Sequence, residues 1–228
     1  MKNGLLAAIK QIPPEFFKQH GGGWPNESST ALVDAVFSMN ARYTTKRNKG
    51  VLDKVKQLRA ELQAPDGWRD SLTMLAAVHP EKLISIMGRS MAAPNSKRSH
   101  PKATAVTLAA TAMNSATGVN SASDISSFIR ADPQRNGKQL KRAYTSVLGL
   151  GPVTFEYFLM LLGVPGVKAD RMILDFVRRA EGNDLKEHEV HQCVEDTHAE
   201  ALARKIVECN LIEFDHAIWR FERQQTRR

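Results

Sequence analysis

Cysteine is scarce in this chain of 228 residues, which contains only Cys193 and Cys209. Two thiols cannot form a disulfide framework, and they are too few for an iron–sulfur cluster held by four cysteines. We therefore expect reduced thiols and a cytoplasmic protein. The histidines near Cys193, which are His188, His191 and His198, follow no specific zinc spacing, so no metal site is predicted.

Long apolar runs are also missing from the sequence. No run approaches the roughly 20 apolar residues that span a bilayer, and no membrane partner is expected. The apolar patch near the N-terminus lacks a small-residue cleavage site and enters Pro13-Pro14, so we do not interpret it as a signal peptide. No stretch alternates apolar and polar residues with a period of two, which argues against a sheet.

Helical periodicity is the dominant pattern in the sequence. Apolar residues recur at helical spacing in 32–37 and in 51–62, and similar stripes follow along the chain, including one over 191–210. About ten to twelve helices joined by short turns predict an all-α fold of two helical lobes.

The predicted organisation is a single unit, 1–228, divided into four parts. A central helical lobe covers 28–145 and includes a long polar, basic loop over 88–101. Residues 146–180 contain a helical hairpin and the start of a further helix. The C-terminal helices in 181–228 complete the second lobe together with the N-terminus.

Charge is distributed unevenly along the chain. The 32 Lys and Arg residues exceed the 24 Asp and Glu residues, and the net charge of +8 favours an anionic partner. Basic residues gather in 42–59, 97–102 and 130–142, whereas 181–200 is acidic. We therefore expect one basic and one acidic face.

The stretch LGLGPVT, residues 148–154, has the composition of a tight turn between two helices. Gly149 and Gly151 can adopt positive φ, and Pro152 suits the first turn of the next helix. The backbone N–H groups of Gly151, Val153 and Thr154 would then lie at a helix N-terminus, which favours phosphate binding. A purely structural turn, with a glycine cap and a proline-started helix, is the alternative.

Farther along, an apolar helix over 154–162 leads to Lys168-Ala169-Asp170, where another helix begins. An aspartate in this position is typical of an N-cap, and a catalytic carboxylate is the second interpretation. Lys168 is predicted to be either a solvated loop lysine or a phosphate contact.

Together these segments resemble the helix-hairpin-helix DNA glycosylases of base excision repair, the endonuclease III-like superfamily. That family combines a Leu-x-Gly-x-Gly hairpin with an essential Asp that opens a later helix. In this chain Asp170 follows Gly151 by nineteen residues. Ser38-Met39-Asn40-Ala41 is similar to the family's Ser-x-Gln-Ala segment, with Asn40 in place of the glutamine that fills the gap left by a flipped base. The similarity covers 28–180.

The resemblance implies double-stranded DNA with a damaged base as the partner, bound by a monomer across the cleft between two lobes. The implied DNA contacts are Gly149, Gly151, Val153, Thr154, Lys168, Asn40, Arg42, Lys97 and Arg98. A monovalent cation on the hairpin carbonyls is the one implied ligand, and no other cofactor is expected. Asp170 would stabilise the developing oxocarbenium sugar and help to activate water. In a prokaryote the protein would associate with the nucleoid.

Two departures from the family pattern narrow the expected activity. Val153 stands where strand-cutting members carry a lysine nucleophile, so lyase activity is not expected. The four cluster cysteines are absent. A monofunctional glycosylase remains, with alkylated purines as expected substrates because those cationic bases leave easily. The candidate stacking residues are Trp24, Phe37, Tyr43, Phe155 and Tyr157. The alternatives are a non-catalytic helix-hairpin-helix DNA-binding protein and an enzyme that has repurposed Lys168.

Overall fold

The structure is a computed structural model that describes residues 4–18, 22–45, 49–62, 67–93 and 99–225. Within these ranges every regular element is a helix and no strand is present, which confirms the predicted all-α class. The elements, in chain order, are α1 (Gly4–Ile9), η1 (Pro14–Phe17), α2 (Ser28–Phe37), α3 (Val51–Glu61), η2 (Trp68–Asp70), α4 (Leu72–Ala77), α5 (Pro80–Met87), α6 (Lys102–Thr117), α7 (Ala122–Ala131), α8 (Pro133–Thr145), α9 (Pro152–Leu161), α10 (Arg171–Glu181), α11 (Glu187–Ala203) and α12 (Leu211–Gln225).

The helices form two compact units. We call Gly23–Val164 the continuous unit, and Met1–Gly22 together with Pro165–Arg228 the discontinuous unit. The division falls inside the segment 146–180 that the sequence groups together. The hairpin and α9 belong to the continuous unit and α10 belongs to the discontinuous unit, because α9 packs on α2 whereas α10 packs on α12.

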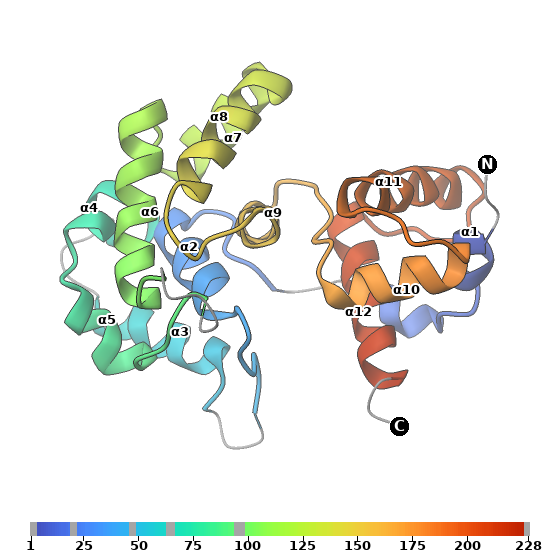
Figure 1. The fold of residues 1–228 in the computed structure, drawn as a ribbon, viewed down its shortest axis with the longest axis horizontal. Helices are drawn as coiled ribbons and strands as arrows, with labels where there is room; N and C mark the ends of the chain where they lie inside the picture. The colour runs from blue at the N-terminus through green and yellow to red at the C-terminus, as the bar shows by residue number, and fades with distance from the viewer. Residues whose placement is uncertain (1–3, 19–21, 46–48, 63–66, 94–98, 226–228) are drawn as a thin grey trace. The chain divides into compact units, whose positions relative to one another are not determined.

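Helix α2 forms the centre of the continuous unit. All ten of its residues are buried, and it packs against α9, α6 and α3 (Figure 1). Burial on every side explains why Ser28, Ser29 and Asp34 in this helix make hydrogen bonds with side chains or backbone groups outside their own turn.

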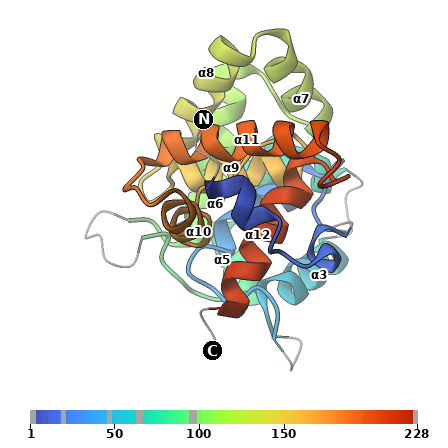
Figure 2. The ribbon, with the colours of Figure 1, turned by 90° about the vertical axis from the view of Figure 1, so that its right-hand side faces the viewer.

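In the discontinuous unit, α10, α11 and α12 enclose a second apolar core that α1 and η1 complete (Figure 2). Helix α10 is strongly amphipathic and directs Ile173, Phe176 and Val177 inward. The predicted helix over 191–210 is too long. Helix α11 ends at Ala203, because Lys205 adopts a left-handed φ of 54° and reverses the chain.

The net charge belongs to one unit. Residues 23–164 contain 18 Lys and Arg against 10 Asp and Glu, whereas the remaining residues contain 14 of each. The formal charge of +8 therefore lies on the continuous unit, and the discontinuous unit is neutral. None of the helices that the structure describes is long and apolar enough to cross a membrane.

Candidate functional site

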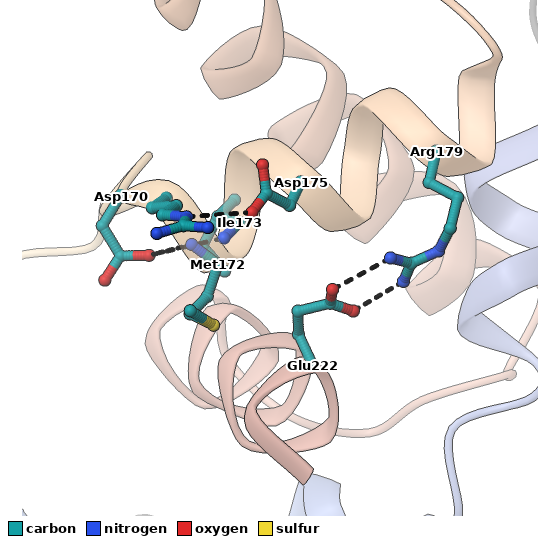
Figure 3. Close-up of polar contacts among 7 residues, drawn as sticks. Asp170, Met172, Ile173, Asp175, Arg179 and Glu222 are labelled. Atoms are coloured by element: carbon teal, nitrogen blue, oxygen red, sulfur yellow. Dashed lines mark hydrogen bonds and ion pairs between the residues drawn. The ribbon is translucent and has the colours of Figure 1, made fainter. Parts of the chain in front are cut away.

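Asp170 is the N-cap of α10. Its Oδ1 accepts hydrogen bonds from the backbone N–H groups of Met172 (2.9 Å) and Ile173 (3.4 Å). Figure 3 shows this oxygen directed at the start of the helix while the other oxygen points away from it. The prediction of an N-cap at this residue is confirmed.

The second oxygen of Asp170 is held by a different helix. Its Oδ2 accepts a hydrogen bond from Nε1 of Trp219 on α12 (3.1 Å), and Nζ of Lys168 lies 3.9 Å away. The Asp170 side chain nevertheless keeps 22% of its surface exposed. An N-cap requires only one carboxylate oxygen, so Oδ2 of Asp170 has no capping role. It is instead held by Trp219 next to the Lys168 ammonium, in a side chain that remains partly exposed.

A second carboxylate supports this arrangement from below the surface. Asp215 is buried, and its Oδ1 accepts a hydrogen bond from the backbone N–H of Lys168 (3.1 Å). Burial raises the pKa of Asp215 well above its ordinary range, and the nearby Asp170 carboxylate raises it further. The N–H group and the charge of Lys168 act in the opposite direction. Helix α12 thus holds both Lys168 and Asp170, through Asp215 and Trp219 one turn apart.

Trp219 contacts two other side chains of α12. The His216 ring stacks on it with centroids 6.0 Å apart and an interplanar angle of 12°. The guanidinium carbon of Arg223 lies 4.8 Å from the indole centroid. Sequence reasoning attached no functional role to Asp215 or Trp219. Their i, i+4 spacing on an amphipathic helix indicates that the two side chains share one face. It does not reveal which segment that face contacts.

The two hairpin glycines have different roles. Gly149 has a φ of 97°, and a Cβ atom there would approach Ala92 Cβ to 2.8 Å and Ser99 Oγ to 2.9 Å. The predicted positive φ is therefore confirmed at Gly149. It is wrong at Gly151, whose φ of −123° is extended backbone that any residue adopts. A Cβ atom at Gly151 would meet no described atom within 4 Å.

Gly151 is the N-cap of α9, and Pro152 occupies the first position of the helix. Because glycine has no side chain, it offers no oxygen to the N–H groups of Val153 and Thr154 in the first turn. Val153 is half-buried and Thr154 is buried. The backbone at Gly151 is thus open to an external group, whereas Gly149 is required by the fold.

The basic loop 88–101 folds back onto this hairpin. Ala92 donates a backbone hydrogen bond to the carbonyl of His100 (3.0 Å), and Ala93 donates one to Ser99 Oγ (2.7 Å). His100 in turn donates to the carbonyl of Leu148 (3.5 Å). The loop and the hairpin therefore form one surface of the continuous unit, although the predicted contacts Lys97 and Arg98 lie outside the described residues.

Asn40 lies in a turn that a buried lysine supports. Its φ of 50° is left-handed, and its side chain is exposed, as is that of Arg42. The amine of Lys102, at the start of α6, donates to the carbonyls of Phe37 (3.1 Å) and Met39 at the end of α2. Burial lowers the pKa of Lys102 to about 8. The sequence placed Lys102 among the basic residues of 97–102, without predicting that it is buried.

Two of the five candidate stacking aromatics, Trp24 and Tyr43, contact Asp34, and a third, Tyr157, neighbours Tyr43. Oδ2 of Asp34 accepts hydrogen bonds from Trp24 Nε1 (2.7 Å) and the Tyr43 hydroxyl (2.9 Å). Burial raises the pKa of Tyr43, and the neighbouring Tyr157 and Asp34 raise it further.

Trp24, Tyr43 and Tyr157 are each half-buried. Phe37 and Phe155 are core residues, 3% and 2% exposed, so they are not available for stacking on a base. The aromatic group near Asp34 is therefore smaller than the sequence predicts.

The predicted site residues divide between the two units. The hairpin, Asn40 and Arg42 belong to the continuous unit, and Lys168 and Asp170 belong to the discontinuous unit. Within the described ranges no three His, Cys, Asp or Glu side chains gather as metal ligands. Of the two thiols, Cys193 is half-buried and Cys209 is buried, and they form no disulfide with each other.

The fold and site define an all-helical protein in which a basic unit carries a glycine hairpin and a neutral unit carries a doubly held carboxylate. The chain belongs to the DUF8548 family, a domain of unknown function, whose family model matches residues 5–223. That range includes helices of both units, so the two units together make up the family's domain. No curated protein and no solved structure matches the chain.

Proposed function

We propose that this chain is a monofunctional DNA glycosylase that releases alkylated purines from double-stranded DNA by hydrolysis, acting as a cytoplasmic monomer. The observation that carries the proposal is the position of Asp170. Its Oδ2 is held by the Trp219 indole with the Lys168 ammonium 3.9 Å away, and the side chain remains partly exposed.

In the proposed reaction the bond between C1′ of the sugar and the purine nitrogen breaks first. The electron pair leaves with the base, and the ionised Asp170 carboxylate stabilises the positive charge that develops on the sugar. Water then adds its oxygen to C1′, and Asp170 accepts the proton that this water releases. The hydrogen bond from Trp219 fixes the carboxylate so that little reorganisation is needed when the charge develops.

The charge of the continuous unit supports DNA as the partner. All of the net positive charge lies on this unit, which also contains the hairpin. Gly151 leaves the backbone open at the start of α9, where N–H groups can bind a phosphate without reading sequence. The half-buried aromatics near Asp34 suit a flat cationic base, which is the reason for preferring alkylated purines.

The lysine nucleophile of a lyase has no counterpart in the hairpin. Val153 occupies that position and carries no group that could attack a sugar. The amine of Lys168 lies beside the Asp170 carboxylate, where it can stabilise that charge or contact a phosphate. We therefore propose base release without strand cleavage.

A non-catalytic DNA-binding protein is the second candidate function. The observation that favours it is that Asp170 caps α10, so this residue has a sufficient structural role without catalysis. Both candidates require the basic continuous unit, and only the glycosylase requires the second oxygen of Asp170.

Asp170→Asn distinguishes the two candidates. The amide oxygen of Asn can still accept from Met172, so the cap is retained, but the charge is lost. For a glycosylase we expect release of methylated purines from duplex DNA to fall by about 100-fold or more. DNA binding should remain within about twofold of wild type, since no phosphate contact is removed.

The matched control is Asp132→Asn, because Asp132 is also an N-cap, on α8, and accepts from the backbone N–H of Arg135 (2.9 Å). This variant should release base at the wild-type rate. If the wild-type protein binds duplex DNA but releases no base from methylated, deaminated or oxidised duplexes, the DNA-binding candidate replaces the glycosylase. Failure to bind DNA at all would remove both.

A further inference from the structure

The discontinuous unit has a cleft of about 500 Å³, and Asp170 is not among the residues that line it. One wall comes from α1 and η1, and the other comes from the residues that follow α11. The volume is within the range of about 300–1,000 Å³ that is typical of small-molecule sites.

The floor of this cleft is apolar. Ile9, Ile12 and Val207 are buried there, and Phe17 and Ile206 are half-buried. Phe17 and Ile206 are therefore the apolar side chains of the floor that still expose surface for the hydrocarbon part of a ligand to cover.

The rim of the cleft is cationic. Lys10, Lys18 and Lys205 line it together with a single acid, Glu208, and all four side chains are exposed. None of the three lysines forms an ion pair with a residue that the structure describes. Three cations around an apolar floor complement a ligand with an anionic head and an apolar body, although the unit as a whole is neutral.

Lys205 occupies its place on the rim at a cost to stability. Its φ of 54° is left-handed. Its N–H donates to the carbonyl of Leu202 (3.0 Å), and that of Ile206 donates to the carbonyl of Ala201 (2.8 Å). This is the Schellman pattern at the end of a helix, where the left-handed position is usually glycine. The fold alone therefore favours glycine at 205, and a lysine there is explained by what its side chain does in the cleft.

We infer that this cleft binds a small amphiphilic anion, a single apolar chain or ring system with one carboxylate or phosphate head. The apolar body lies on the floor at Phe17 and Ile206, and the head group pairs with Lys10, Lys18 and Lys205. This site is independent of the proposed glycosylase chemistry, since it shares no residue with the Asp170 cluster.

Calorimetric titration of the full-length protein with decanoate, kept below its micelle-forming concentration, tests the inference. Decyltrimethylammonium has the same chain with a cationic head and should bind at least about tenfold more weakly. Decyl phosphate should bind like decanoate, and acetate and inorganic phosphate should not compete, because they lack the apolar body. Equal binding of the cationic amphiphile, or displacement of decanoate by acetate or inorganic phosphate at equal concentration, would overturn the inference.

Variants of the rim lysines test the residues themselves. Asparagine tolerates a left-handed φ but carries no charge, so Lys205→Asn should weaken decanoate binding about threefold. The triple variant Lys10→Ala, Lys18→Ala, Lys205→Asn should weaken it more than about tenfold. Lys138→Ala, at an exposed lysine of α8, is the charge-matched control for Lys205→Asn and should have no effect on decanoate binding. Unchanged decanoate binding in the triple variant would overturn the inference.

Lys205→Gly separates the role in binding from the role in folding. Relief of the left-handed strain should raise the thermal midpoint of unfolding by about 2–4 °C, while decanoate binding weakens about threefold. A variant that is more stable and binds decanoate as tightly as wild type would show that the lysine has no binding role and would overturn its place in the site.

Discussion

The continuous and discontinuous units differ in the kind of work that their residues can do. The continuous unit has a net charge of +8 and presents an open glycine backbone at the start of α9. The discontinuous unit is neutral overall and holds the Asp170 carboxylate through Trp219, with Lys168 beside it. Under the proposed function, the continuous unit would attract DNA and the discontinuous unit would supply the catalytic carboxylate, so the two roles can be altered one at a time.

Each unit also buries an ionisable side chain with a shifted pKa, Lys102 in one and Asp215 in the other, and the two shifts change stability with pH in opposite directions. Lys102 in the continuous unit has its pKa lowered to about 8 by burial. Asp215 in the discontinuous unit has its pKa raised by burial and by Asp170. Lys102 donates to the backbone carbonyls of Phe37 and Met39, just before Asn40. Asp215 accepts from the backbone N–H of Lys168. Each buried group therefore holds the backbone next to or at a predicted site residue.

The largest expected effect concerns DNA affinity. Affinity for duplex DNA should fall about 100-fold or more between about 50 and 200 mM salt, because several phosphates are neutralised. The triple variant Arg42→Ala, Lys138→Ala, Arg142→Ala on the continuous unit should reduce the slope of log affinity against log salt by about 2–3, measured by fluorescence anisotropy. Removal of Lys10, Lys18 and Lys205 from the discontinuous unit is the charge-matched control. Equal losses in the two triple variants would break the distinction between the units.

The next effect separates the two hairpin glycines. Gly149→Ala combines a left-handed φ with a Cβ contact of 2.8 Å to Ala92, and should destabilise the protein by about 2 kcal/mol in chemical denaturation. Gly151→Ala should leave stability unchanged, since its backbone is extended and no described atom lies nearby. If Gly151 is a phosphate contact, this variant alone loses DNA affinity without losing stability. Wild-type affinity in Gly151→Ala would count against the hairpin as a DNA contact.

The buried lysine should give the continuous unit a stability that increases with alkaline pH. Between about pH 8 and the unfolded pKa of about 10.4, the unfolded chain binds the Lys102 proton and the folded chain does not. The free energy of unfolding therefore rises with pH in this window, by about 2 kcal/mol. Lys102→Met should abolish this rise when denaturation is compared at pH 7.5 and 9.5. A rise that persists in the variant would assign it to another group.

The smallest expected effect concerns Asp215. Its raised pKa means that the folded chain retains a proton that the unfolded chain releases above about pH 4, so the wild-type protein loses stability as pH rises through that range. Asp215→Asn removes this loss and keeps an acceptor for the Lys168 N–H. We expect the variant to be about 1 kcal/mol more stable than wild type at pH 7 and equal to it near pH 4. Destabilisation at pH 7 would contradict the assignment.

Local features of the site could be predicted from the sequence, and contacts distant in sequence could not. The helical class, the left-handed Gly149 and the Asp170 cap follow from spacing and residue type within a few positions. The hold of Trp219 on Asp170 joins residues 49 positions apart, and it depends on how α12 packs against α10.

The errors of prediction have similar causes. The sequence predicts too long a helix α11 because the left-handed residue that ends a helix is usually glycine. Here that residue is Lys205, so no glycine marks the end of the helix. The sequence did not predict that the net charge lies on one unit. The boundaries of the units depend on long-range contacts between the first 22 and the last 64 residues, which no local pattern reveals.

The discontinuous arrangement has a consequence for biosynthesis. Leu5, Ile9 and Phe16 leave the ribosome first, but the helices that bury them begin only at Arg171. At roughly 5–20 residues per second, translation takes about 10–40 s to supply α10 through α12, while the continuous unit can already fold. During this interval the N-terminal apolar residues have no native partner, so we expect newly made chains to depend on chaperones most at this stage.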